Sequence, residues 1–281
     1  MDQIRTALDA DWLGACRRAV GGLETMLSAT PETADRARET GTRGSGGDRT
    51  LLIDRDAESL VVAELDALHG DGYRFSALSE ERGQIDYGDP GVWVIIDPID
   101  GSLNAKRDAL HYALSVAVAD GPTAADVAFG FVHDFGAGEQ WWAYRGQGAF
   151  RDGERLDPEA PERRSREGKL ELVGIESADP RWVARSIGGL EDCAHRLRAL
   201  GTIASTLCQV AAARFDGMLT LSRARGVDAA AGQLIVREAG GLVSFTAFED
   251  PLGAPMDTSP SSPLVAARSE QGLRELEAIR A

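Results

Sequence analysis

Several features that mark common functional classes are absent from this chain of 281 residues. Its three cysteines, Cys16, Cys193 and Cys208, are widely spaced and form no CxxC pair, so neither a disulfide framework nor a zinc site is expected. There is no GxxxxGK(S/T) phosphate loop and no GxSxG nucleophile motif, and the four histidines have no metal-binding or triad-like spacing. The sequence therefore predicts neither a P-loop enzyme nor a hydrolase with a serine or cysteine nucleophile.

Positive charge is also scarce. The chain has 30 basic and 45 acidic residues, a net charge of −15, and lysine occurs only at Lys106 and Lys169. An acidic protein repels polyanions, so nucleic acid and membranes are not expected partners. The apolar runs are short, and Tyr112–Ala119 is far below the roughly 20 residues that a membrane span needs. The acidic N-terminus does not resemble a signal peptide, and we expect a cytoplasmic protein.

The apolar residues predict helices and strands that alternate along the chain. Helical periodicity is found at 1–30, 57–69, 180–188, 204–213, 228–239 and 269–279. Short apolar runs predict strands at 91–96, 114–119, 127–132, 170–175, 242–245 and 263–267, with a hairpin at 140–151. Since the alternation has no strict βαβ period, we expect an α/β or α+β protein with layered sheets. The glycine-rich segment 42–50 is predicted to be a mobile loop, and the charged segment 151–169 predicts a boundary between halves 1–165 and 166–281.

The strongest chemical signal lies in WVIIDPIDGSLN, residues 93–104. A buried strand leads into Asp97, and Pro98 is expected to end the strand ladder because it has no N–H. The carboxylates of Asp97 and Asp100 would repel each other unless a cation lay between them, and the carbonyl of Ile99 could supply a third oxygen. Oxygen ligands of this kind suit Mg²⁺.

The next two residues of this segment could bind an anion. The backbone N–H groups of Gly101 and Ser102 could face a phosphate at a helix start. The alternative is an ordinary turn, because Asp-Pro and Asp-Gly are common turn formers and Ser102 could simply cap a helix.

Further acidic residues are candidates for the same site. The Glu80-Glu81 doublet lies in ALSEERG and could instead be a solvated edge. Asp228 lies in GVDAAAGQLIVREAGG, where it could instead be a helix N-cap. Asp48 and Asp54 lie on either side of the exit from the glycine-rich segment, six residues apart.

Together these segments resemble the inositol monophosphatase family, the Mg²⁺-dependent, lithium-sensitive sugar phosphatases that also include fructose-1,6-bisphosphatases. DPIDGSLN, residues 97–104, is similar to the first motif of the family, and VDAAAGQLIVREAGG, residues 227–241, is similar to the second. The Glu-Glu doublet occurs upstream at its usual place, and the resemblance covers about residues 40 to 245. It implies a layered αβαβα fold and a homodimer.

The resemblance also implies a set of metal ligands. Glu80, Asp97 and the Ile99 carbonyl would hold a first Mg²⁺, and Asp97, Asp100 and Asp228 would hold a second. A third, looser ion would rest on Glu80 and water. The expected cofactor is thus two or three Mg²⁺ ions in each active site.

The remaining positions that match the family concern phosphate and water. Gly101 and Ser102 match the residues that bind phosphate through backbone amides and a hydroxyl. Asp54 matches the acid that orients the attacking water together with the Ser102 hydroxyl and the metal at Glu80. Asp48 lies where the family often keeps another loop acid. The implied mechanism is in-line attack by metal-activated water, with no covalent phospho-enzyme.

Departures from the family pattern concern the substrate. Lys106 lies close to the first motif, where it could bind a second anionic group or simply be solvated. Arg223 and Arg225 precede Asp228, where myo-inositol enzymes typically keep an acid that contacts substrate hydroxyls. Arginines there favour a bisphosphate or an acidic sugar phosphate, as in the archaeal-type enzymes with fructose-1,6-bisphosphatase activity.

The leading prediction is a phosphatase that acts on a small polyol or sugar phosphate, similar to inositol monophosphate. Fructose 1,6-bisphosphate is the main alternative, and 3′,5′-bisphosphorylated nucleotides and histidinol phosphate are more distant ones. A hypothesis from another class is a catalytically weak member that binds a phosphorylated metabolite or a partner protein as a regulator. The complete set of Glu80, Asp97, Asp100 and Asp228 argues against it, because a binding-only descendant would not need every ligand.

Overall fold

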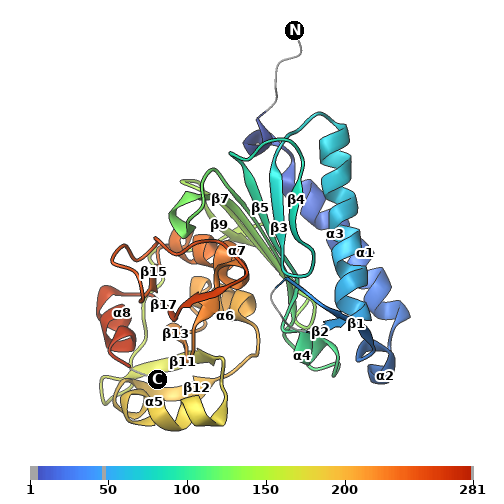
Figure 1. Cartoon of the computed structure of the whole chain (residues 1–281). Coiled ribbons are helices and arrows are strands. Elements are labelled where there is room, and N and C mark those ends of the chain that lie inside the picture. The colour runs from blue at the N-terminus through green and yellow to red at the C-terminus, as the bar shows by residue number, and fades with distance from the viewer. Residues whose placement is uncertain (1–5, 46–48, 280–281) are drawn as a thin grey trace.

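Five alternating layers of helix and sheet make up the fold in the computed structural model, which describes residues 6–45 and 49–279 (Figure 1). The layers are, in order, helices α1 (Trp12–Ala29) and α3 (Leu52–Gly70), an eight-stranded sheet, helices α6 (Ile203–Ala211) and α7 (Gly226–Glu238), a five-stranded sheet, and helices α5 (Pro180–Cys193) and α8 (Glu270–Glu277). The predicted αβαβα architecture is confirmed.

The eight-stranded sheet is antiparallel except at one pair of strands. Its spatial order is β10 (Glu154–Arg155), β9 (Gly148–Arg151), β8 (Glu139–Tyr144), β7 (Val127–Asp134), β6 (Ala113–Ala119), β5 (Trp93–Asp100), β3 (Ser76–Ser79) and β4 (Gly83–Asp86). β3 and β5 run parallel, with Ser79 paired with Ile96. Because the carboxyl ends of parallel strands meet at one edge of a sheet, the residues that follow Ser79 and Ile96 lie close together.

The predicted end of β5 at Pro98 is wrong. Asp97 pairs with Ser115 and Asp100 with Ala113, and the register shifts between these two pairs. Pro98 falls inside this irregularity, where its missing N–H removes no ladder hydrogen bond. The strand therefore continues to Asp100 and carries both acids.

The first helical layer covers the outer face of the eight-stranded sheet. The apolar positions of α1, among them Trp12, Leu23 and Leu27, are buried as their helical spacing predicts. α3 buries Val61 and Leu65 in the same core, which also includes apolar side chains of β5, β6 and β7. Burial of this apolar face is what holds the layer on the sheet.

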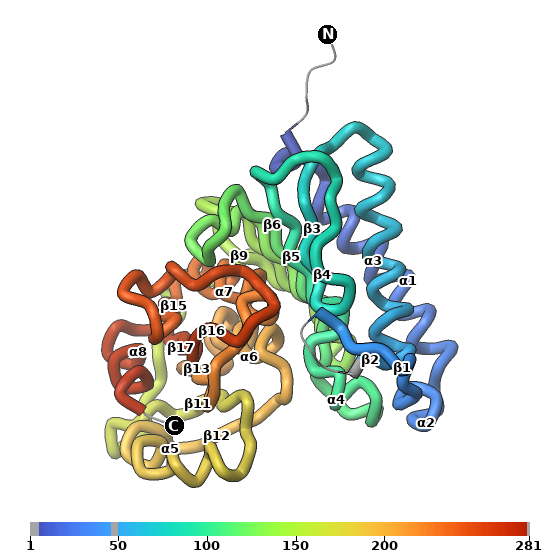
Figure 2. The backbone as a smooth tube through the Cα atoms, in the orientation of Figure 1, coloured from blue at the N-terminus to red at the C-terminus, as the bar shows by residue number. Residues whose placement is uncertain are grey.

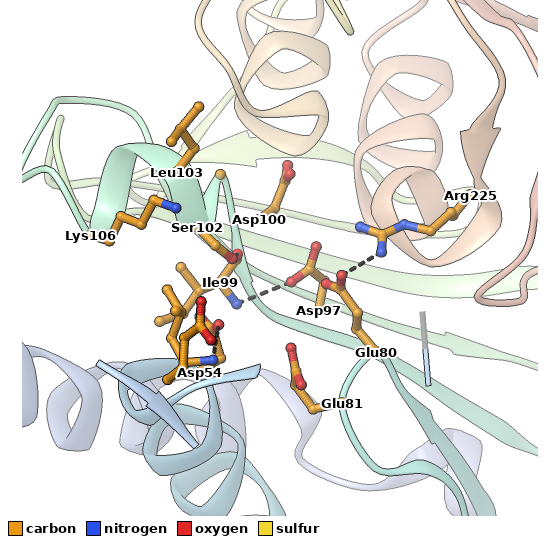
Figure 3. Close-up of a pocket in the computed structure, with 13 residues that line it drawn as sticks. Asp54, Glu80, Glu81, Asp97, Ile99, Asp100, Ser102, Leu103, Lys106 and Arg225 are labelled. Carbon is orange, nitrogen blue, oxygen red and sulfur yellow. Dashed lines mark hydrogen bonds and ion pairs between the residues drawn. The ribbon is translucent and has the colours of Figure 1, made fainter. Parts of the chain in front are cut away.

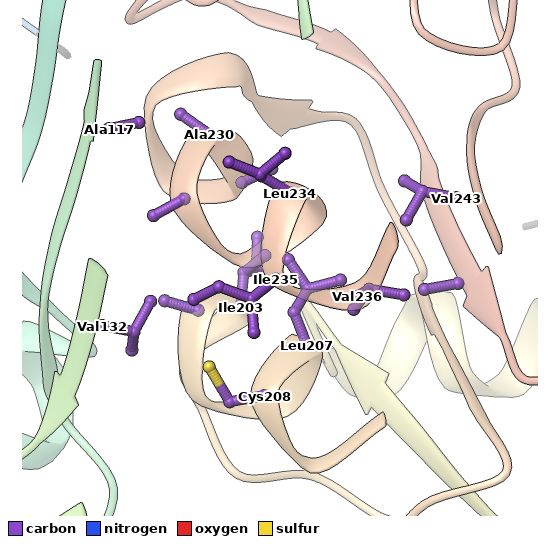
Figure 4. Packing of buried hydrophobic residues seen from close by; sticks show 14 of the residues in the cluster. Ala117, Val132, Ile203, Leu207, Cys208, Ala230, Leu234, Ile235, Val236 and Val243 are labelled. Carbon is purple, nitrogen blue, oxygen red and sulfur yellow. The ribbon is translucent and has the colours of Figure 1, made fainter. Parts of the chain in front are cut away.

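The middle layer is buried on both sides. Every residue of α6 is buried, and so is α7 from Gly226 to Val236, as expected for helices that lie between two sheets. Glycines allow the close approach: a Cβ on Gly232 would lie 2.7 Å from the Leu207 side chain. Figure 4 shows Ala117 and Val132 of the eight-stranded sheet on one side of these helices and Val243 on the other.

The five-stranded sheet forms the fourth layer. Its spatial order is β12 (Ala194–Arg198), β11 (Leu170–Glu176), β13 (Gly217–Thr220), β17 (Leu264–Ala267) and β15 (Leu242–Phe245). β11 runs parallel to its neighbours β12 and β13, and β17 runs antiparallel to its neighbours β13 and β15. A separate core on the outer face includes Leu170, Leu190 and Leu276, which joins α5 and α8 to this sheet.

Short elements complete the fold. They are η1 (Ala7–Asp9), α2 (Thr33–Arg36), β1 (Glu39–Arg43), β2 (Arg49–Leu51), α4 (Ser102–Ala105), η2 (Ala124–Asp126), β14 (Ala224–Arg225) and β16 (Pro260–Ser262). β1 pairs with β2, so both ends of the segment 42–50 belong to strands, and the prediction of a loop there is wrong at those ends. Residues 46–48, which include Asp48, lie outside the described residues. The tube in Figure 2 shows this strand pair beside α4.

The two halves of the chain have a common core. The strands of the first sheet lie before residue 156 and those of the second after residue 169, but α6 and α7 from the second half pack against the first sheet. The boundary between 1–165 and 166–281 stays a prediction. Within 6–45 and 49–279, no helix combines the length and the apolar character needed to cross a membrane.

Candidate active site

A pocket of about 470 Å³ lies at the edge of the first sheet where β3 and β5 end (Figure 3). It is lined by Glu39, Leu51, Asp54, Glu80, Glu81, Asp97, Ile99, Asp100, Gly101, Ser102, Leu103, Lys106 and Arg225. β1, β2 and α3 supply one wall, the turn after β5 and α4 a second, and Arg225 at the start of α7 a third. The pocket thus combines elements from both halves of the chain.

Asp97 lies at the centre of this pocket. Its side chain is buried, and its Oδ1 accepts a hydrogen bond of 3.1 Å from the Ile99 N–H. Oδ2 is also buried and has no hydrogen-bond partner among the described residues. A buried carboxylate oxygen without a partner is costly, so this atom indicates a place for a cation or a donor from a ligand.

Asp100 connects the pocket to the second half of the chain. Its Oδ2 accepts hydrogen bonds from the Thr202 hydroxyl at 2.6 Å and the Ala204 N–H at 2.7 Å. Burial, followed by the charge of Asp228, raises the pKa of Asp100 to about 8. Ser102 follows two residues after Asp100, and its hydroxyl donates a hydrogen bond to the Ile99 carbonyl at 3.0 Å.

Three carboxylates converge from separate elements. Glu80 follows β3, Asp97 lies in β5 and Asp228 lies in the first turn of α7, and one oxygen of each is within 4.8 Å of the others. Burial and the neighbouring charges of Glu80, Asp100 and Asp228 raise the pKa of Asp97 well above its ordinary value. Burial also raises the pKa of Asp228 to about 6, although Arg225 acts in the opposite direction.

This donor set fits a hard divalent cation. It consists of carboxylate oxygens, one of which is buried and has no hydrogen-bond partner among the described residues, and Ile99 also lines the pocket. Such oxygens are the preferred ligands of Mg²⁺, and a cation between them would offset the repulsion that raises their pKa values. The residues present therefore fit the metal that the sequence predicts.

The turn after β5 depends on a glycine. Gly101 has a φ of +89°, and a Cβ at this position would lie 3.0 Å from the Gly201 carbonyl oxygen and 3.1 Å from that of His111. Only glycine tolerates both the left-handed backbone and the close approach. The turn brings Ser102 and the start of α4 to the pocket wall.

Asp54 lies in the first turn of α3, on the opposite wall. Its Oδ2 accepts a hydrogen bond of 3.1 Å from the Leu51 N–H, and its buried Oδ1 has no partner among the described residues. Burial, with the charges of Glu81 and Glu80, raises the pKa of Asp54 to about 7. Glu81 accepts a hydrogen bond from the Thr50 hydroxyl at 2.5 Å.

The structure separates the two arginines that the sequence placed together. Arg225 enters the pocket, where it forms ion pairs with Glu80 and, at 2.9 Å, with Asp228. Arg223 is exposed and lines a different cavity, beside Trp182 and Leu221. On a regular strand, side chains two residues apart face the same side, but the pairing of this segment with β16 is irregular between Ala224 and Arg225, and the two arginines line different cavities. Lys106 lines the active-site pocket on the α4 side, across from Arg225 (Figure 3).

Sequence reasoning missed the polar contacts that support the first motif. The Asn104 amide donates to the Leu200 carbonyl at 2.7 Å and to the His111 carbonyl at 2.9 Å. The buried carboxylate of Glu176 accepts from the N–H groups of Leu200 and Gly201, each at 3.0 Å. Asn104 was visible as part of the motif, but nothing in the sequence around Glu176 indicated this role.

Comparison with known proteins identifies the class to which this fold and pocket belong. The family model described as "Inositol monophosphatase family" matches residues 13–279. The chain is 33% identical over 244 residues to the fructose-1,6-bisphosphatase/inositol-1-monophosphatase of Methanothermobacter thermautotrophicus. The matched region covers 83% of this chain and 84% of the relative. It is also 33% identical over 232 residues to the Nus factor SuhB of Escherichia coli K12, with 81% and 82% covered.

Solved structures agree with this result. The extragenic suppressor protein SuhB from Bartonella henselae superposes with a TM-score of 0.76 at 23% identity, over 95% of this chain and 98% of that one, which supports the fold. The chain belongs to the inositol monophosphatase family, and the resemblance noted in its sequence is confirmed. Membership supports a phosphatase in general terms and, since the family is generally metal-dependent, a metal requirement.

Proposed function

We propose that this protein is a Mg²⁺-dependent phosphatase that hydrolyses the phosphate monoester of a small polyol or sugar. The observation that carries the proposal is the convergence of Glu80, Asp97 and Asp228 on one point, with the Asp97 Oδ2 buried and without a partner among the described residues. The family and the name of the Methanothermobacter relative support the same class of substrate.

The proposed metal ligands are the acids of the pocket and one carbonyl. Glu80, Asp97 and the Ile99 carbonyl would hold one Mg²⁺, Asp97, Asp100 and Asp228 a second, and Glu80 with water a third. When bound, Mg²⁺ would act as a Lewis acid that lowers the pKa of water and stabilises charge on the phosphate. The protein holds these acids on two strand ends and a helix start, so their relative positions depend on the rigid core.

The remaining residues would orient the substrate and move a proton. The backbone N–H groups of Gly101 and Ser102, at the start of α4, would hold phosphate oxygens. Asp54 would orient the attacking water together with the Ser102 hydroxyl and accept a proton at Oδ1. In the metal-free pocket, burial raises the pKa of Asp54 to about 7, which favours uptake of a proton by this carboxyl.

The substrate is proposed to carry one essential phosphate, as inositol monophosphate does. Fructose 1,6-bisphosphate remains the alternative, and Lys106 and Arg225 on opposite walls are the cations that could meet its second phosphate. We leave Arg223 out of the proposed site, because it lines another cavity. A homodimer and a cytoplasmic location are parts of the same proposal, and light scattering on the purified protein tests the first.

A regulatory role is the second candidate function. The relative from Escherichia coli is named as a Nus factor, and Arg225 already pairs with two of the proposed metal ligands. In a binding-only protein these ion pairs could be permanent. The two functions differ in turnover, which can be measured directly.

Phosphate release tests the proposal. Purified protein is given inositol 1-phosphate, fructose 1,6-bisphosphate, adenosine 3′,5′-bisphosphate or a generic aryl phosphate, with millimolar Mg²⁺ or with EDTA. We expect Mg²⁺-dependent release and a higher kcat/KM for inositol 1-phosphate than for the nucleotide. A tenfold preference for the fructose ester would select the alternative substrate, and no release from any ester would favour the regulator.

A further inference from the structure

The metal cluster contains a positively charged side chain from the protein itself. We propose that the guanidinium of Arg225 competes with a divalent cation for Glu80 and Asp228, so that this side chain must be displaced before the metal binds. The inference rests on the proposed function, since it concerns the same acidic residues. It adds that the affinity of the site for metal is set by an internal competitor.

The contacts of Arg225 are those of a bound cation. Its Nε lies 3.0 Å from the Asp228 Oδ2 and its Nη2 lies 2.9 Å from the Asp228 Oδ1, which is the two-pronged geometry of a strong arginine–carboxylate pair. Its Nη1 donates to the Glu80 Oε1 (Figure 3). Both oxygens of Asp228 and one of Glu80 are therefore in contact with the guanidinium.

These oxygens cannot bind the guanidinium and a divalent metal ion at the same time. One oxygen of Glu80, Asp97 and Asp228 lies within 4.8 Å of the others, so the cluster is small. Mg²⁺ binds its ligands at about 2.0–2.1 Å and demands near-octahedral geometry. Oxygens whose lone pairs already accept hydrogen bonds from arginine cannot take up that geometry around a metal ion. A divalent ion on the same oxygens would also lie beside a like charge. Metal and guanidinium are thus alternatives at Glu80 and Asp228.

The backbone around Arg225 is held in place, so the side chain is the part that can move. A Cβ on Gly226 would lie 2.0 Å from the Pro255 carbonyl oxygen, and the Val227 N–H donates to the Asp257 carbonyl at 3.0 Å. On the preceding side, Ala224 pairs with Ser262 in the adjacent strand. The Arg225 side chain itself is 19% exposed, which leaves it a path toward the pocket and the solvent.

The experiment measures metal binding rather than activity. Mn²⁺ binding is followed by electron paramagnetic resonance, and Mg²⁺ binding by calorimetry, for the wild type and for Arg225→Gln, Arg225→Lys and Arg223→Gln. Arg223→Gln is the matched control, because it removes one positive charge two residues away from a side chain that lines a different cavity. Thermal unfolding of the metal-free proteins and far-ultraviolet circular dichroism are recorded alongside.

We expect Arg225→Gln to bind Mn²⁺ at least tenfold more tightly than the wild type. Its metal-free form should unfold at a lower temperature, because the carboxylates lose their counter-charge, and added Mn²⁺ should raise that temperature by more than in the wild type. Arg225→Lys keeps the positive charge but loses the two-pronged contact with Asp228. Its affinity for Mn²⁺ should therefore lie between those of the wild type and Arg225→Gln. Arg223→Gln should bind Mn²⁺ as the wild type does.

Each other outcome overturns a distinct claim. Equal or weaker Mn²⁺ binding by Arg225→Gln would show that the arginine supports the site or is indifferent to it, and the competition would be wrong. If Arg223→Gln gained as much Mn²⁺ affinity as Arg225→Gln, net charge alone would explain the effect. The proposed competition would then be wrong. If neither the wild type nor Arg225→Gln binds Mn²⁺ or Mg²⁺, the proposed metal-dependent function itself fails.

Discussion

The carboxylate of Asp100 accepts a hydrogen bond of 2.6 Å from the hydroxyl of Thr202, a residue 102 positions further along the chain. The same oxygen accepts the Ala204 N–H in the first turn of α6. A proposed metal ligand on the first sheet is therefore held by the helix that packs between the two sheets. Ligand geometry in this site depends on how the two halves dock.

This relationship predicts the effect of Thr202→Val. The substitution removes the donor to Asp100 and the cap that accepts the Ser205 N–H at 3.2 Å, so we expect a loss of about 1–3 kcal/mol of unfolding free energy and weaker Mg²⁺ binding. Thr25→Val is the matched control, since its exposed hydroxyl donates only to the Gly21 carbonyl. Urea unfolding and calorimetry measure the two effects, and equal losses in both variants would contradict the link.

Asp97→Asn should abolish turnover without loss of the fold. The amide cannot replace a carboxylate as a ligand for Mg²⁺, so kcat should fall by far more than tenfold, the factor that corresponds to about 1.4 kcal/mol of barrier. Because one of several crowded negative charges is removed, the metal-free variant should unfold at the wild-type temperature or above. Asp192→Asn, an exposed change on α5, serves as control. Activity within tenfold of the wild type would refute the assignment of Asp97.

The metal-free protein should lose stability as the pH rises from about 4 to 8. The pKa of Asp54 is raised from 3.8 to about 7 and that of Asp100 from 3.8 to about 8, so the folded state binds more protons than the unfolded state across this range. Stability from these groups is fully present below the unfolded pKa and is lost as the pH passes through the folded pKa, by at most about 1.4 kcal/mol per pH unit for each group. Urea unfolding at several pH values measures this slope.

Two comparisons isolate the origin of the slope. Asp54→Asn should reduce it, and added Mg²⁺ should reduce it in the wild type because a cation favours the ionised acids. An unchanged slope in Asp54→Asn would mean that burial does not raise the pKa of this carboxyl in the folded state.

Gly101→Ala should damage the site more than an equivalent change elsewhere. Gly101 and Gly138 both have positive φ, +89° and +64°, but only Gly101 has neighbours that a Cβ would meet closely. Gly138→Ala should therefore cost about 1–2 kcal/mol of unfolding free energy for the backbone alone. Gly101→Ala should cost more and also raise KM, because the turn that positions Ser102 must shift. Similar values for the two variants would show that the close approach to Gly201 and His111 is not a constraint.

Much of the fold was predictable where its signal is local. The apolar period of α1 and the short apolar runs of β5 and β6 predicted elements that the structure contains. β12 was missed because its sequence, AHRLR, is a polar edge strand with no apolar run. The continuation of β5 beyond Pro98 was missed because a register shift, which depends on the partner strand, accommodates the proline.

The sequence by itself determined the acids and the glycine turn of DPIDGSLN, because each depends on residues within a few positions. Only the tertiary structure decided that Asp228 lies beside Asp97, and that Arg225 rather than Arg223 enters the pocket. Contacts between residues more than a hundred positions apart arise from the packing of both sheets on α6 and α7. Which of the two arginines enters the pocket depends on the irregular pairing of this segment with β16 at Ala224 and Arg225, which composition and spacing do not specify.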